Sequence, residues 1–289
     1  QVKESHAGQI VSPDFPKLRY AIAMKPGAPK GFMDWRDMLA AGKSVEDDVL
    51  EEVAATLKPN DVINIQYTSG TTGFPKAAQL THRNILMNAW YVTGCQDITE
   101  KDRMCVPVPF YHCFGCVMGS LGAIVRGAAI VIPAEYFNPG ATLDAIEKER
   151  CTTIYGVPTM FVAMLDDASF KGRDLKSLRS GIMAGSTCPI EVMKKVMNEM
   201  GCREITIAYG QTETSPVVTQ STTSDPIELR VETVGRAIPG VDIKIVDPET
   251  GKTLSDNLQG ELCARGHCNM VGYYKNPEAT QHTIRGGWV

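Results

Sequence analysis

The chain has 289 residues, of which 43% are hydrophobic and 21% charged, and its formal net charge is −4. This composition is typical of a globular protein with a buried core, and a slightly acidic chain without a basic cluster argues against nucleic-acid binding. The nine cysteines are irregularly spaced, which favours free thiols in a reducing compartment over a disulfide framework. The most apolar region, residues 116–132, contains Arg126 and several glycines, so it predicts buried core rather than a transmembrane segment.

The order of apolar and polar residues predicts three regions. Residues 1–60 form a leading mixed segment with helices expected at 34–41 and 47–57. Residues 61–215 form an α/β body, in which short apolar strands alternate with helices and predict a largely parallel sheet covered by helices. The expected strands of this body are 62–67, 103–108, 128–132, 152–156, 180–184 and 204–209, and the expected helices are 81–92, 142–149, 158–165 and 189–200.

The third region, residues 216–289, is expected to be a smaller antiparallel β subdomain without further helices. Residues 241–246 alternate at period two, a turn follows, and residues 260–265 can return as the partner strand. The chain begins at Gln1 rather than at a methionine and ends directly after the turn-like Gly286-Gly287-Trp288. We therefore expect it to be the central part of a longer protein.

The strongest motif follows the expected strand at 62–67 and reads Thr68-Ser69-Gly70-Thr71-Thr72-Gly73-Phe74-Pro75-Lys76. Glycines allow the backbone to approach a ligand closely, and backbone N–H groups and hydroxyls can then donate to phosphate oxygens. Lys76 adds a positive charge. The motif is not a Walker A loop, because Pro75-Lys76-Ala77 stands where that loop requires Gly-Lys-Ser or Gly-Lys-Thr. The alternative interpretation is a polar surface loop.

A second motif, Tyr209-Gly210-Gln211-Thr212-Glu213-Thr214, follows the expected strand at 204–209. Because the carboxyl ends of parallel strands share one edge of a sheet, we expect this motif to face the phosphate loop. A carboxylate such as Glu213 suits Mg²⁺ that is shared with substrate phosphates. The alternative interpretation of Glu213 is a solvated surface acid.

These motifs resemble those of AMP-forming acyl-CoA synthetases in the adenylate-forming superfamily, and further matches follow in the family's order. They are Pro109-Phe110-Tyr111-His112-Cys113-Phe114-Gly115, Ala184-Gly185-Ser186, Gly260-Glu261-Leu262-Cys263-Ala264-Arg265-Gly266 and Gly272-Tyr273-Tyr274. One departure is Ala77, where the family usually has glycine. The resemblance spans residues 61–289 and is closer to fatty-acyl-CoA ligases than to amino-acid-activating domains.

The resemblance implies roles for particular residues. The loop Thr68–Lys76 would bind the phosphates of ATP, Ala184-Gly185-Ser186 would contact adenine, and Tyr209 would pack on it together with Gly210 and Gln211. Thr212 would contact phosphate and Glu213 would bind Mg²⁺, so Lys76, Thr212 and Glu213 are the expected catalytic residues. Tyr111, His112 and Phe114 would border the acid and CoA channels.

The implied reaction activates a carboxylic acid, expected to be a fatty acid, with ATP to acyl-AMP and then transfers the acyl group to CoA. Other adenylate-forming enzymes (an aryl-CoA ligase or an amino-acid adenylation domain) and a non-catalytic nucleotide-binding module remain alternatives. The family's mobile C-terminal domain is absent from this sequence, so we expect this stretch alone to have weak or no turnover. We also expect no nucleic-acid partner, a homodimer, and a cytoplasmic or, in a eukaryote, mitochondrial location.

Overall fold

The computed structural model describes residues 8–68 and 74–289, which divide into two compact units, Gln1–Lys58 and Pro59–Val289. In the first unit, two short parallel strands precede two helices, and the Asp34 carboxylate caps the first helix by accepting from the Arg36 N–H at 2.9 Å. Neither helix has a buried residue. The elements are β1 (Ile22–Ala23), β2 (Met33–Asp34), α1 (Trp35–Gly42) and α2 (Asp47–Thr56).

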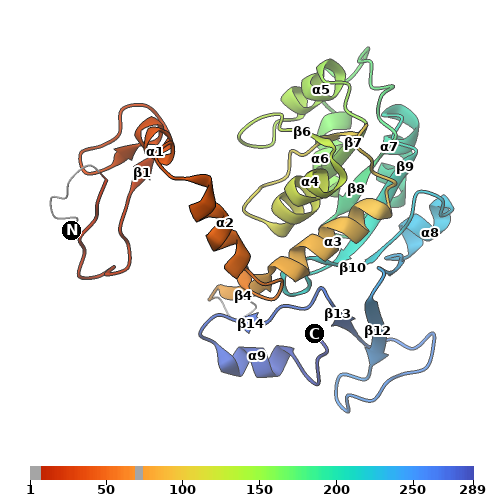
Figure 1. Cartoon of the computed structure of the whole chain (residues 1–289). Helices are drawn as coiled ribbons and strands as arrows, with labels where there is room; N and C mark the ends of the chain where they lie inside the picture. The colour runs from red at the N-terminus through yellow and green to blue at the C-terminus, as the bar shows by residue number, and fades with distance from the viewer. Residues whose placement is uncertain (1–7, 69–73) are drawn as a thin grey trace. The chain divides into compact units, whose positions relative to one another are not determined.

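The second unit is built on a seven-stranded sheet with helices on both faces (Figure 1). The strands from β9 to β6 are parallel, whereas β10 and β11 add to the sheet antiparallel. This arrangement confirms the expected α/β fold with a largely parallel sheet. In spatial order the strands are β11 (Arg236–Ala237), β10 (Val217–Gln220), β9 (Glu204–Gly210), β8 (Ser180–Ala184), β7 (Thr153–Gly156), β5 (Arg103–Cys105) and β6 (Ala129–Val131).

Both faces of the central strands are buried, which explains their continuous apolar sequences. Successive side chains of a strand point to opposite faces, so Tyr155 and Ile182 enter one hydrophobic cluster, whereas Ile154 and Met183 enter the other. The first cluster includes side chains of α3 (His82–Gly94), η1 (a π-helix, Phe114–Leu121) and α4 (Gly122–Arg126). The second includes side chains of α5 (Pro139–Lys148), α6 (Pro158–Leu165) and α7 (Ile190–Glu199). Among the described residues, no helix has both the length and the apolar character needed to cross a bilayer.

The expected burial of the strand at 62–67 in the parallel sheet is wrong. β3 (Val62–Thr68) pairs antiparallel with β4 (Lys76–Thr81), and β14 (Gly272–Tyr273) completes a separate three-stranded sheet. The polar face of β3 points inward: Gln66 is buried and its amide donates to Cys116 Sγ at 3.5 Å, whereas Ile63 and Ile65 are exposed. The apolar run correctly indicates a strand, but it does not determine which face of the strand is buried.

The sequence predicts no helix after residue 216, and this prediction is also wrong. α8 (Ile227–Glu232) follows Pro226, and α9 (Pro277–Thr283) begins at Asn276, whose side chain accepts from the Ala279 N–H. The expected hairpin does form, with β12 (Val241–Val246) antiparallel to β13 (Glu261–Gly266). The boundary at residue 216 stays a prediction, and β10 and β11 beyond it belong to the seven-stranded sheet.

Candidate functional site

A cavity of about 720 Å³ lies where three parts of the second unit meet. The end of the β3–β4 hairpin contributes Thr68 and Lys76, which are paired residues of the two strands. The segment after β9 contributes Gln211 and Glu213. The antiparallel hairpin and the segment from β14 to Val289 form the remaining wall, with Lys244, Val246, Asp247, Pro248, Gly251, Glu261, Leu262, Cys263, Tyr273, His282, Thr283, Arg285, Trp288 and Val289.

The segment Tyr209–Thr214 is held rigidly at the end of β9. A Cβ atom added to Gly210 would lie 1.9 Å from the Pro216 carbonyl oxygen, so only glycine allows the chain to approach β10 this closely. A short 3₁₀ turn, η2 (Thr212–Thr214), follows, and the Thr214 hydroxyl accepts from the Gln211 N–H at 3.1 Å. This turn places the Glu213 side chain in the cavity wall.

Asn88 of α3 fixes the strand that follows η2. Its side chain is fully buried, its amide donates to the Val217 carbonyl at 2.7 Å, and its carbonyl oxygen accepts from the Val217 N–H at 3.2 Å. The Ser215 hydroxyl donates to the Cys268 carbonyl at 2.7 Å and ties the same turn to the segment before β14. The position of Glu213 is therefore determined by contacts from α3 and from the last part of the chain.

Glu213 is largely buried, with 8% of its surface exposed, and its carboxylate has a close partner. The Tyr273 hydroxyl donates to Glu213 Oε1 at 2.5 Å. Lys76 Nζ lies 5.0 Å from the centroid of the same tyrosine ring, within the range of a cation–π interaction. The cavity thus holds a carboxylate, an ammonium group and a phenol close together.

A second cavity, of about 730 Å³, lies at the carboxyl ends of β8 and β9. Gly185 and Ser186 follow β8 and line it, whereas Ala184 is buried within the strand. Tyr209 lines both cavities and is 44% exposed. Tyr209 is therefore shared by the two cavities. The other residues that line this second cavity are Thr187, Cys188, Ile207, Ala208, Gly210, Val231, Glu232, Thr233, Val234 and Gly235.

The motif Pro109–Gly115, which contains Tyr111, His112 and Phe114, does not line either cavity. Tyr111 is 83% exposed, whereas Phe114 is buried in the core, with its ring centroid 5.8 Å from that of Tyr155. His112 Nδ1 accepts from the Phe114 N–H at 3.0 Å, and burial lowers the pKa of its imidazole. The neutral ring thus has a local structural contact, and the role of these three residues at the acid channel stays a prediction.

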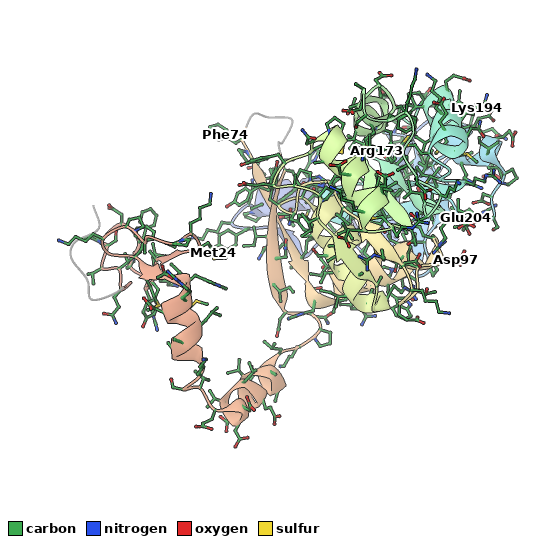
Figure 2. All side chains as sticks on the ribbon, turned by 90° about the horizontal axis from the view of Figure 1, so that it is seen from above. Met24, Phe74, Asp97, Arg173, Lys194 and Glu204 are labelled. Atoms are coloured by element: carbon green, nitrogen blue, oxygen red, sulfur yellow. The ribbon has the colours of Figure 1, made fainter. Side chains whose placement is uncertain are left out.

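The other expected site residues fall into two groups. Ser69, Gly70, Thr71, Thr72 and Gly73 lie outside the described residues, while Phe74, exposed, follows them beside the hairpin end (Figure 2). Pro75 is exposed and Thr212 is partly buried, but neither lines the cavities. The sequence motifs indicated no role for Tyr273, Lys244 or Trp288. Lys244 and Arg265 lie over the Trp288 ring at 4.3 and 4.6 Å, a contact between distant segments that no local motif could reveal.

A family model of AMP-binding enzymes matches residues 15–274, which is most of the chain. The chain belongs to the AMP-binding enzyme family. This finding confirms the resemblance indicated by the motifs. In this member of the family, Gln211 and Glu213 after β9 and Thr68 and Lys76 at the hairpin end line one cavity.

Individual AMP-binding enzymes are similar over nearly the whole chain. The Bacillus subtilis protein named "Putative acyl-CoA synthetase YngI" is 49% identical over 290 residues, which are 100% of this chain and 53% of that protein. Medium-chain acyl-CoA ligase ACSF2, mitochondrial, of Danio rerio is 41% identical over 98% of this chain and 47% of its own. The chain spans about half the length of the curated relatives that it matches.

Solved structures agree with the fold. ATP-bound MatB from Rhodopseudomonas palustris matches with a TM-score of 0.73 and 28% identity over 83% of this chain and 48% of its own. The anthranilate CoA ligase AuaEII in complex with anthranoyl-AMP gives a TM-score of 0.85 over 96% of this chain and 52% of its own. Its identity of 24% supports the shared fold alone.

Proposed function

We propose that the full-length protein activates a carboxylic acid with ATP, forming an acyl adenylate and pyrophosphate, and then transfers the acyl group to CoA. One observation carries the proposal: Lys76, Tyr209 and Glu213, which the family motifs assign to phosphate, adenine and metal, line one cavity. A carboxylate is a poor acylating agent. Attack of its oxygen on the α-phosphate of ATP expels pyrophosphate and gives an acyl adenylate, from which AMP is a good leaving group. The protein's contribution is then orientation and stabilisation of developing charge.

Within this proposal, Lys76 stabilises the charge on the ATP phosphates and Tyr209 packs on the adenine. Glu213 fits a site for Mg²⁺, because its carboxylate lines the cavity and has only one oxygen hydrogen-bonded among the described residues. The described residues contain no group of three His, Cys, Asp or Glu side chains that could hold a metal ion. A single carboxylate fits Mg²⁺ that is bound largely by substrate phosphates and water. When bound, Mg²⁺ neutralises phosphate charge.

We infer that the acid is a fatty acid of medium length. Relatives named medium-chain acyl-CoA ligase support the medium length. The resemblance of Tyr111-His112-Cys113-Phe114-Gly115 and of the sequence after Tyr209 to fatty-acyl-CoA ligases supports a fatty acid, but not its length. An aryl-CoA ligase or an amino-acid adenylation domain would activate a different acid, and a non-catalytic module would bind ATP without the reaction. The homodimer and the cytoplasmic or mitochondrial location remain predictions.

The deciding experiment is carboxylate-dependent ATP–pyrophosphate exchange by the full-length protein with short to long fatty acids, aromatic acids and amino acids. We expect exchange with medium-chain fatty acids and a fall of at least about 100-fold in Lys76→Ala and Glu213→Gln, since preorganised charge stabilisation is a large part of catalysis. Lys195→Ala and Glu199→Gln are matched controls, because both side chains are exposed on α7 and away from the cavities.

Each outcome selects one account. Exchange with an aromatic or amino acid instead of a fatty acid would retain adenylation and replace the substrate. ATP binding without exchange for any acid would favour the non-catalytic module and overturn the proposal. An equal loss in the control variants would mean that the loss in Lys76→Ala and Glu213→Gln reflects folding rather than chemistry.

A further inference from the structure

Tyr273 contacts both charged groups of the cavity, although no motif assigns it a role. Its hydroxyl donates to Glu213 Oε1 at 2.5 Å, and its ring face lies 5.0 Å from Lys76 Nζ. Tyr273 is 5% exposed and Glu213 is 8% exposed, so the hydrogen bond between them is largely buried at the cavity wall. A hydrogen bond to an ionised group in such surroundings is stronger than one at the surface.

The backbone around Tyr273 fixes the position of its ring. β14 pairs with β4, so that Tyr273 is the register partner of Ala78, two residues from Lys76. The Tyr273 N–H donates to the Thr280 hydroxyl at 2.9 Å, which connects the strand to α9. A Cβ atom at Gly272 would lie 2.7 Å from Thr280 Cγ2, so strand and helix pack in close contact here. The phenol is thus held on secondary structure rather than on a free loop.

A buried carboxylate is costly unless hydrogen-bond donors satisfy it. Of the two carboxylate oxygens of Glu213, which faces the cavity, only Oε1 accepts a hydrogen bond from a described residue.

We propose that Tyr273 is a positioning residue: its hydroxyl holds one oxygen of Glu213 and leaves the other free for the cation of the metal–ATP complex. The proposal rests on the proposed function for the identity of that ligand. It assigns Tyr273 no contact with the reacting atoms. Its effect is on the orientation of a carboxylate, as outer-shell partners orient metal ligands elsewhere.

The test uses Tyr273→Phe in the full-length protein, which removes the hydroxyl and keeps the ring over Lys76. Tyr274→Phe is the matched control, because the neighbouring side chain is 47% exposed and its ring contacts Lys275 instead. Mn²⁺ affinity is measured by electron paramagnetic resonance in the presence of a non-hydrolysable ATP analogue. The Mg²⁺ concentration that gives half-maximal exchange is measured in parallel.

In Tyr273→Phe we expect the dissociation constant for Mn²⁺ and the Mg²⁺ concentration for half-maximal exchange to rise at least about tenfold, the usual effect of losing a residue that orients a metal ligand. Both quantities should stay unchanged in Tyr274→Phe. If Tyr273 acts through Glu213, adding Tyr273→Phe to Glu213→Gln costs no further affinity. Equal Mn²⁺ affinity in Tyr273→Phe and wild type overturns the positioning role even if exchange is intact. A wild type without exchange overturns the proposed function, and the Mn²⁺ comparison still decides the role of Tyr273. Melting temperatures by circular dichroism confirm that the variants are folded.

Discussion

Gly210 shows how strongly one residue constrains the site. A methyl group there would lie 1.9 Å from the Pro216 carbonyl oxygen and 2.9 Å from its carbonyl carbon, both of which are backbone atoms. Gly210→Ala should therefore push β10 and η2 away from β9 and displace Glu213. Because a displacement of about 1 Å can cost about 100-fold in rate, we expect a loss of that order in ATP–pyrophosphate exchange.

The control for Gly210→Ala is Gly140→Ala, because the nearest heavy atom to a Cβ at Gly140 is 3.6 Å away. Exchange by this variant should stay within about twofold of wild type, since ordinary van der Waals contact adds no strain. Wild-type exchange in Gly210→Ala would contradict the close contact between β9 and β10 on which the description of the site depends.

At the residue scale, local motifs predicted the part of the site that is local in sequence. Lys76, Tyr209, Gln211 and Glu213 line one cavity. The expected reason, a shared edge of one parallel sheet, does not hold for Lys76, which lies on the separate antiparallel sheet of β3 and β4. Tyr273 could not be found in this way, because its partner Glu213 is 60 residues away in sequence. A turn motif indicates where the chain bends, but it does not indicate which side chain the bend brings to a distant carboxylate.

At the element scale, a buried ion pair joins the parallel strands at the end opposite the cavities. Asp102 precedes β5 and is 4% exposed. It accepts from Arg179 Nη2 at 2.9 Å and from the Thr152 hydroxyl at 2.7 Å. Burial opposes ionisation of this carboxyl, but the hydrogen bonds from Arg179, Thr152 and the Thr99 backbone outweigh it and lower the pKa of Asp102. The ionised form is thus the one that stabilises the fold.

Asp102→Asn should lower the free energy of unfolding at neutral pH by about 1–3 kcal/mol, since it removes one charged partner of the half-buried Arg179, which keeps Glu204 at 2.8 Å. The folded pKa of Asp102 lies below its ordinary value of 3.8, so the stabilisation is complete above that value and is lost as the pH falls through the folded pKa. Urea denaturation at pH 7 and at decreasing pH below 4 measures the difference between wild type and variant. A difference that does not shrink in acid would contradict this account.

The sequence predicted best those elements whose burial is unambiguous. The bounds of β8 and α6 match the expected ranges, because a strand buried on both faces and a helix opened by proline have clear signals. β4 was missed, since two alanines, a glutamine and a lysine in Lys76–Thr81 give a weak strand propensity. Its strand conformation depends on pairing with β3 on one side and with β14 on the other, which is tertiary information.

At the scale of the whole molecule, much apolar surface of this chain has no cover among its described residues. Ile63, Ile65 and Tyr67 on the outward face of β3 are 49%, 42% and 70% exposed, and neither α1 nor α2 has a buried residue. Large exposed apolar surfaces mark places where another part of a protein packs. The curated relatives are about twice as long as this chain, so their further residues can supply such cover.

A polypeptide limited to residues 1–289 should therefore retain the cavity residues but lose turnover. Lys76, Tyr209 and Glu213 remain on one cavity, so we expect measurable binding of an ATP analogue. Exchange should fall to about 1% of that of the full-length protein or less, because the rate depends on additional groups that hold the acid and ATP in reacting geometry. Calorimetric binding and exchange are compared at equal concentration, with full-length Glu213→Gln as the baseline. Turnover equal to that of the full-length protein would show that the described cavity alone contains the complete catalytic machinery.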